Sequence, residues 1–534
     1  QESTEVTLKD ILVRIDRLEA KVDSGFAKCH DQLKSETSEK RDVAQALESS
    51  STGNSVLSHP SVDPVPLVDY VPVIPPSTEK IEKDECKQGM AIPDDLWQKV
   101  FQNLSVYQLF QVRLTSRQWN QIVRTSDSIM DKMILHFPPE TILCSDSEEF
   151  GALKSTHYNR IVLDRVTLVE PSSWWPICCE NLHTLTVINC NVLLEELLRM
   201  LELSKNLKDL TVDFGDLKNV PEIKFQLKSL EKLNICGAAH PEVLKTLMDM
   251  CPKIMTLKLP YIGNTGKSLD KEVLELCIQF ILSVKNTLQD LTVQGGQEDF
   301  WRSIISTIKN IPLKRLTSPL PSIKAYKDQN ILNELNELNI EALCVTNSLS
   351  SFVINPFGKL QMLKELEVEI DPRSIIHFDN LLELQHLKVK GDFDLPRSLT
   401  KLKSIELINH YSYLYLLDAH PNLNSIILRA SKIYSLTDFF TQCATLKTLH
   451  SIELSNVSEE NKSTCFFKHF PHLKCLKLSA CKMSTNFLKT TFTLCPNLEE
   501  VSLVHMENVN DEVLLKLFQK SGPSLKFFIT SRLT

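Results

Sequence analysis

Most of the chain follows one short pattern of apolar and polar positions. The pattern reads apolar-x-x-apolar-x-apolar, and Leu473, Leu476 and Leu478 form a clear copy. Its alternating half is typical of a short strand with one buried face, because successive side chains of a strand point to opposite faces. Successive copies lie 18 to 34 residues apart. The sixteen copies begin at Tyr158, Leu182, Leu207, Leu230, Ile254, Leu288, Leu313, Ile340, Leu363, Leu384, Leu402, Leu423, Leu449, Leu473, Leu498 and Leu525.

The residues between copies lead the chain back to the start of the next strand. Residues 269–284 (LDKEVLELCIQFILSV) have helical periodicity and give the clearest prediction of a helix. The copies from Leu363 to Leu423 lie so close together that we expect extended or 3₁₀ segments there. One repeat cannot bury its own apolar face, so the array is predicted to stack into an α/β solenoid of about 15–16 repeats.

Three short helices are predicted ahead of the repeats, in residues 91–123. Pro93 suits the first position of a helix, and acidic residues follow it in the first turn. Ser105 and Thr115, each with a glutamine three positions on, are typical of capping boxes that begin the second and third helices. Helices this short rarely bury one another well, so their apolar residues are expected to pack on the rest of the chain or on another protein.

This segment opens with Ile92 and Pro93 and closes with Trp119, with apolar residues at fixed spacings between them. At these positions it resembles the F-box, although Gln118 stands where the family has a second basic residue. The resemblance implies docking onto the Skp-family adaptor of an SCF ubiquitin ligase and, through it, onto cullin. A generic three-helix cap on a larger domain is the alternative. The residues implied for adaptor binding are Ile92, Pro93, Leu96, Val100, Phe101, Leu104, Leu109, Val112 and Trp119.

Within that set, Leu96, Phe101 and Leu104 are expected to form an apolar stripe that stays partly exposed in the isolated chain. The repeats in turn look like those of the F-box/leucine-rich-repeat family, because Cys190 and Cys481 follow two of the copies. Turns such as residues 495–498 (CPNL) add to this likeness. The resemblance predicts an F-box at residues 89–137 and a leucine-rich-repeat solenoid at residues 138–534.

Two further segments precede the F-box. Residues 1–34 carry apolar residues at heptad spacing over about four heptads, with Gly25 at one core position. A short coiled coil that supports weak self-association explains this pattern, and so does a single amphipathic helix or a frayed segment. Residues 35–88 are polar and then rich in proline, so we predict a disordered linker.

Composition and charge narrow the classes of function. The net charge of −8 and the pI near 6.0 argue against general nucleic-acid binding. No run of apolar residues is long enough to predict a membrane span. The 15 cysteines follow no disulfide framework, which favours reduced thiols in the cytoplasm or the nucleus. Because the sequence begins with Gln1 rather than methionine, we expect a fragment or a processed product.

Two motifs contain residue types found in reactive sites. GNTGKS at residues 263–268 ends like a phosphate-binding loop, but Tyr261 stands where that loop needs its first glycine. Cys178 and Cys179 follow two tryptophans in a predicted apolar turn. A reactive thiol favours nearby positive charge, and the next residue is Glu180, so packing is the better explanation.

Cys465, His469, His472 and Cys475 have spacings that a zinc ion accepts. The repeat pattern explains them without a metal, because it places His472 in a turn and Cys475 on a strand. We therefore predict no metal, no cofactor and no catalytic group.

Charged residues flank the apolar positions of two neighbouring copies, acidic in one and basic in the next. Since neighbouring strands place such residues side by side, the two rows either neutralise one another or leave part of the surface unpaired to bind a charged target segment. The candidate target-binding residues are Glu365, Glu367, Glu369, His386, Lys388 and Lys390.

Taken with the resemblance, these features predict a non-catalytic substrate-recognition subunit of an SCF-type ubiquitin ligase, whose repeats bind an unknown target protein for degradation. Its contribution would be proximity, because holding the target lysine near the conjugating enzyme raises its effective concentration. The alternative is a non-degradative interaction scaffold that uses the F-box only for assembly.

Overall fold

The structure, a computed structural model, describes residues 93–102, 104, 106–144, 158–213, 223–237, 240–262, 268–295, 298–319, 334–349, 357, 359–371, 378–393, 395–410, 417–433, 435–459 and 468–531. All of them belong to the second of the two units into which the chain divides, residues 89–534. The coiled coil predicted at residues 1–34 and the linker predicted at residues 35–88 lie outside the described residues.

Four helices come first: α2 Asp94–Phe101, α3 Val106–Thr115, α4 Arg117–Thr125 and α5 Asp127–Met130. Pro93 is the N-cap of α2 rather than its first helical residue. Ser116 caps α4 by accepting a hydrogen bond from the Trp119 N–H. The predicted cap, Thr115, is instead the last residue of α3, where its hydroxyl donates to the Val112 carbonyl. The prediction was wrong by one position because both residues have a hydroxyl side chain suited to a cap.

Seventeen parallel strands of the described residues form one sheet, in which neighbours along the chain pair with one another. The strands are β1 Ile134–His136, β3 Arg160–Asp164, β5 Thr184–Ile188, β6 Asp209–Asp213, β7 Lys232–Cys236, β8 Thr256–Ile262, β9 Asp290–Gly295, β10 Arg315–Ser318, β11 Ala342–Leu349, β12 Glu365–Ile370, β13 His386–Lys390, β14 Ser404–Ile408, β15 Ser425–Arg429, β17 Ser451–Ser455, β19 Cys475–Ser479, β20 Glu500–Val504 and β21 Phe527–Ser531. Every strand except β1 begins two residues after the start of a predicted copy, so the predicted register of all sixteen repeats is confirmed.

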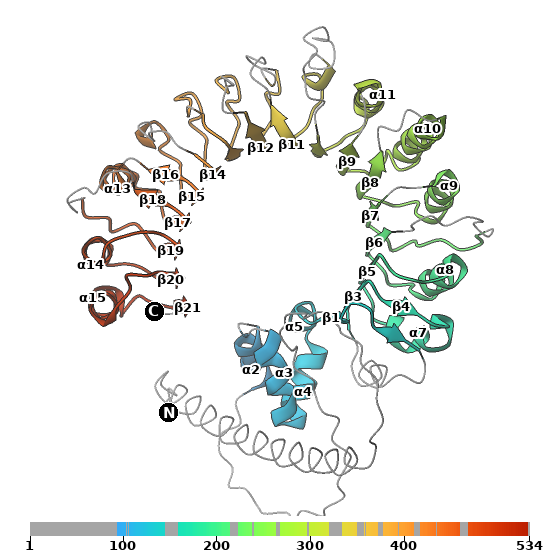
Figure 1. Cartoon of the computed structure of the whole chain (residues 1–534), viewed down its shortest axis with the longest axis horizontal. Helices are drawn as coiled ribbons and strands as arrows, with labels where there is room; N and C mark the ends of the chain where they lie inside the picture. Colours follow the sequence, from blue (N-terminus) through green and yellow to red (C-terminus); the bar gives the residue numbers. More distant parts are fainter. Residues whose placement is uncertain are drawn as a thin grey trace, which may run out of the picture. The chain divides into compact units, whose positions relative to one another are not determined.

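The strands line the inner side of the array in Figure 1, and helices cover its outer side. These helices are α7 Pro171–Cys179, α8 Leu194–Leu203, α9 Pro241–Met250, α10 Ser268–Ser283, α11 Glu298–Ile308, α13 Leu436–Cys443, α14 Thr485–Leu494 and α15 Asp511–Ser521. The helix predicted at residues 269–284 is confirmed as α10. Between β12 and β15 the described outer segments contain only the 3₁₀ helix η1, Leu417–Ala419, as the close spacing of those copies predicted.

Two small pairs of parallel strands lie beside the main sheet. One joins β2 Ile142–Leu143 to β4 Thr167–Leu168, and the other joins β16 Lys432–Ile433 to β18 Ser458–Glu459. Both lie in the segments that leave the inner strands, so they add main-chain hydrogen bonds between neighbouring repeats.

The apolar positions of the repeats pack into one continuous core. Leu476 and Leu478 of β19 are buried together with the leucine that precedes the strand, Leu473, while the residues between them face the other side of the sheet. Buried apolar area is the main stabilising contribution to such an array. Each repeat buries its apolar side chains against its two neighbours only.

Most strands in the second half of the array end at a residue with left-handed backbone. Asn456 follows β17 with φ 52°, and Ala480 follows β19 with φ 51°. Each donates its N–H to the last strand residue of the following repeat, Asn456 to the Ser479 carbonyl at 2.7 Å and Ala480 to the Val504 carbonyl at 2.9 Å. The turn that leaves one strand is therefore also a link to the next repeat.

Candidate interaction surfaces

An aromatic cluster holds the first helices together. Trp97 and Phe101 of α2 stack at 5.6 Å, and Trp119 of α4 lies 4.7 Å from Trp97 and 5.6 Å from Phe101. Phe101 is only 1% exposed, so the expectation that it joins an exposed stripe was wrong. Both tryptophans contact its ring, and a helical period alone could not show this packing. Leu109 is fully buried as well, so both residues shape the domain from inside.

Other apolar side chains of these helices face outward. Leu96 and Val100, one turn apart on α2, are 46% and 39% exposed, and Leu114 near the end of α3 is 76% exposed. Val106 at the start of α3 is exposed to a similar degree as Val100. Large apolar side chains with so little cover are typical of a docking surface when several lie on one small domain.

The remaining residues predicted for adaptor binding lie between these extremes. Leu104, Val112 and Trp119 are half-buried and pack against the core, while Pro93 is exposed ahead of α2. Ile92 and the predicted cap Ser105 lie outside the described residues. Adaptor binding by this set stays a prediction.

The two charged rows predicted on the inner face lie directly opposite one another. Glu367 of β12 faces Lys388 of β13 at 2.7 Å, and Glu369 faces Lys390 at 3.0 Å. The hydrogen bond from Lys388 to Glu367 raises the pKa of the lysine, as expected for an ammonium group that has gained a carboxylate partner.

The other two candidates are also paired. Glu365 contacts Arg315 of β10 at 2.5 Å, and His386 shares a hydrogen bond with the Ser404 hydroxyl at 2.7 Å. All six predicted target-binding residues therefore have partners within the sheet. This favours mutual neutralisation, and target binding by these residues stays a prediction.

A further ion-pair cluster on the inner face was not predicted. Arg429 at the end of β15 reaches Glu406 of β14 and Glu453 of β17, each at 2.8 Å. Its hydrogen bond to Glu406 is the main cause of its raised pKa. The signal in the sequence was a pair of glutamates at the same position of two repeats, on either side of Ile427.

The cysteines of the repeats that the structure describes are buried or half-buried. Cys178 and Cys179 lie on helix α7 and not in a turn, and burial raises the pKa of Cys178 to about 12. Cys481 is buried and donates its thiol to the carbonyls of Leu454 and Ser479, both at 3.3 Å. A thiol with a raised pKa holds little thiolate at neutral pH and is a poor nucleophile.

The structure describes only part of the GNTGKS motif and of the predicted cysteine and histidine group. Residues 263–267 of the GNTGKS motif and Cys465 lie outside the described residues, whereas His472 is in the turn before β19 and Cys475 begins that strand. The described residues contain no group of three or more histidine, cysteine or acidic side chains arranged to hold a metal ion. None of the described helices combines the length and the apolar character needed to cross a membrane.

Comparison with known proteins identifies the first helices. A family model described as the F-box domain matches residues 91–130, which include α2 to α5. No curated protein matches the chain. Three solved structures that resemble it are distant in sequence.

An internalin (InlF) from Listeria monocytogenes is 13% identical, with a TM-score of 0.31 over 63% of this chain and 89% of that chain. The mouse RP105/MD-1 complex is 14% identical, with a TM-score of 0.36 over 70% and 74% of the two chains. The leucine-rich-repeat ectodomain of the membrane receptor kinase GASSHO1/SCHENGEN3 from Arabidopsis thaliana is 13% identical, with a TM-score of 0.25 over 76% and 54%.

Proposed function

The chain joins an F-box domain to a leucine-rich-repeat solenoid, and from this we propose that it acts as a substrate-recognition subunit of an SCF-type ubiquitin ligase. The F-box would dock onto a Skp-family adaptor and thereby onto cullin. The repeats would hold a target protein for ubiquitination. The chain itself would supply no nucleophile or base.

The observation that carries the proposal is the F-box at residues 91–130 together with its uncovered apolar side chains. Leu96 on α2 and Leu114 on α3 expose apolar area that folding alone would favour burying. A partner that covered both helices would remove this area from water. Adaptor docking explains why the area stays uncovered within the chain.

The connection between the two parts supports a positioning role. Only three residues separate α5 from β1, and Met133 among them is buried. β1 then pairs with β3, the first strand of the repeats. A short, hydrogen-bonded connection would keep a target on the repeats at a limited range of distances from the adaptor, which is what catalysis by proximity requires.

Co-precipitation of the full chain with the adaptor and cullin tests this function. The double variant Leu96→Ser and Leu114→Ser should lose both partners while its circular dichroism remains that of the intact chain. Leu515→Ser on α15 is the matched control, because Leu515 is 58% exposed but lies outside the F-box. Unchanged adaptor binding by the double variant would overturn the docking surface.

The cellular level of a target protein then distinguishes a degradative role of the chain from a role as a non-degradative scaffold. Proximity labelling with the intact chain and with the double variant should reveal proteins that depend on the repeats alone. Depletion of the chain should make a true target accumulate. Stable target levels, with adaptor binding intact, would identify a non-degradative scaffold instead.

A further inference from the structure

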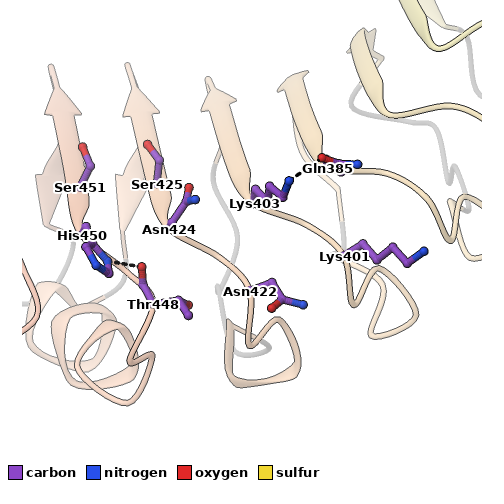
Figure 2. Close-up of a pocket in the computed structure, with 9 residues that line it drawn as sticks. All are labelled: Gln385, Lys401, Lys403, Asn422, Asn424, Ser425, Thr448, His450 and Ser451. Carbon is purple, nitrogen blue, oxygen red and sulfur yellow. Dashed lines mark hydrogen bonds between the residues drawn. The ribbon is translucent and has the colours of Figure 1, made fainter.

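We propose that a groove at the start of strands β13 to β17 binds an acidic segment, rich in aspartate and glutamate, of the protein that the repeats recruit. The groove has a volume of about 770 Å³ and lies where the chain enters four neighbouring strands (Figure 2). The proposal rests on the proposed function only for the nature of the ligand, a protein held by the repeats.

Every side chain that lines the groove ends in a polar or charged group, and none of these groups is a carboxylate. Three hydroxyl side chains contribute, and none of the lining side chains is aliphatic. A nucleic acid would find too few stacking surfaces there, in a chain of net charge −8. The other lining residues are Gln385, Lys401, Lys403, Asn422, Asn424 and His450.

Four of these residues form a regular row, because each occupies the position immediately before its strand. The N–H of Lys403 donates to the Gln385 carbonyl at 2.7 Å, that of Asn424 to the Lys403 carbonyl at 2.8 Å, and that of His450 to the Asn424 carbonyl at 3.0 Å. Main-chain bonds therefore hold the side chains side by side, about 4.8 Å apart. A row of this kind is preorganised and requires little ordering on binding.

Carboxylates neutralise this row only at its ends. Lys364, one position before Gln385, pairs with Glu341 at 3.1 Å, and Lys474, one position after His450, pairs with Glu499 at 2.9 Å. Glu341 and Glu499 occupy the same position before β11 and β20. The six residues at that position before the strands between them, β12, β13, β14, β15, β17 and β19, include no acidic side chain. The centre of the row is therefore the part whose positive charge an incoming acid would meet.

Lys403 is the central cation. Its ammonium donates to the Gln385 amide oxygen at 2.8 Å, and no carboxylate pairs with it within the described part of the chain. An amide partner positions the ammonium but leaves its charge uncompensated. Lys401 is different, because Glu383 lies 2.6 Å from it, so it contributes less net charge.

Asn424 adds hydrogen-bond donors beside Lys403, whereas the N–H of His450 is used within the chain. Asn424 can present its amide N–H groups to a carboxylate. His450 contacts the Thr448 carbonyl through Nδ1, as Figure 2 shows. Because a carbonyl only accepts, Nδ1 carries the hydrogen, and Nε2 of the neutral ring is an acceptor, so Asn424 and not His450 is the hydrogen-bond donor beside Lys403. Charge-assisted bonds from such donors are what a carboxylate requires for specific binding.

The test uses the purified full chain and a fluorescein-labelled peptide of alternating glutamate and aspartate. Fluorescence anisotropy should show binding that weakens as salt is raised, and the peptide with glutamine and asparagine at the same positions should not bind. Lys403→Glu and Asn424→Asp should each weaken binding by about tenfold, since each places a carboxylate in the groove. Lys403→Arg should retain binding.

Lys208→Glu is the matched control. Lys208 is exposed, and it occupies the same position before β6, where its N–H donates to the His183 carbonyl. The substitution changes net charge by the same amount outside the groove, so binding should stay within about twofold. Equal losses of peptide affinity in Lys208→Glu and Lys403→Glu would show only a general effect of net charge. That result would overturn the proposal that the groove binds the peptide.

A phosphoserine peptide of the same length forms the second arm. Much tighter binding of that peptide than of the carboxylate peptide would overturn the assignment to aspartate and glutamate. Adaptor co-precipitation of Lys403→Glu, measured separately, should match that of the intact chain. Failure of the intact chain to bind the acidic peptide at low salt would therefore reject the groove without touching the F-box proposal.

Discussion

The Lys388 ammonium lies 2.7 Å from the Glu367 carboxylate, at directly facing positions of β13 and β12. Glu367→Lys should place two positive charges on those positions and lower the free energy of unfolding by about 0.2–1 kcal/mol, because both side chains are partly exposed, 44% for Glu367 and 39% for Lys388. Adding Lys388→Glu should restore most of the loss. Urea unfolding of the four chains of this double-mutant cycle measures the coupling, and a loss of several kcal/mol would contradict a surface pair.

The same pair bears on target binding. If the two rows only neutralise one another, Glu365→Lys with Glu367→Lys should keep every partner of the intact chain. Loss of a target at low salt, with adaptor binding retained, would show that these carboxylates also bind the target. Proximity labelling of the two chains distinguishes these results.

Phe101 and Leu114 should respond very differently to truncation. Phe101→Ala removes a buried ring from between two tryptophans and should destabilise the F-box by about 3–5 kcal/mol. Leu114→Ala removes exposed area and should change stability by less than about 0.5 kcal/mol. Limited proteolysis at increasing temperature, followed at cleavage sites within α2 to α5, measures the stability change caused by each substitution. Equal protection in the two variants would contradict the burial of Phe101.

Leu476 should contribute to its own neighbourhood rather than to the whole array. Leu476→Ala should cost about 2–5 kcal/mol, because the side chain is fully buried between repeats. Amide hydrogen exchange should accelerate in β17, β19 and β20 and stay unchanged near Leu163 in β3. Equal acceleration at both places would mean that the repeats unfold as a single unit.

Glu499 should give the last repeats a dependence on acid. Hydrogen bonds from Lys526 and then from Lys474 lower the pKa of Glu499 from 4.5 to about 2. Because the folded pKa is the lower one, the contribution to stability is present above about pH 4.5 and is lost as the pH falls towards 2. Glu499→Gln should flatten this part of the pH profile. Urea midpoints at pH 5 and pH 2.5 provide the comparison, and parallel profiles would contradict it.

Strand positions could be predicted from the sequence because each repeat carries its own signal. The two apolar positions that follow Leu473 specify both the strand and its buried face, without help from distant residues. β1 has no such signal, since residues 134–136 (ILH) form only three positions of a strand. Its pairing with β3 became visible only in the folded chain.

Surfaces were harder to predict than strands, because they depend on what neighbouring elements cover. Leu96 and Phe101 looked alike as apolar residues of one helix, yet two tryptophans cover only Phe101. The groove had a signal, the missing carboxylates around Lys403, but that signal has meaning only once the repeats are stacked. Sequence periodicity describes one repeat, whereas a binding surface belongs to several.

The left-handed residues that end the strands have a consequence for how the gene could change length. Asn456 and Ala480 join one repeat to the next through the same main-chain bond, although their side chains differ. A junction made by backbone atoms is the same wherever it occurs, so loss or duplication of one complete repeat would leave compatible ends. Loss of a single residue within a strand would instead move its apolar side chains to the wrong face. We therefore expect length differences among related genes to fall in multiples of a whole repeat or within the outer segments.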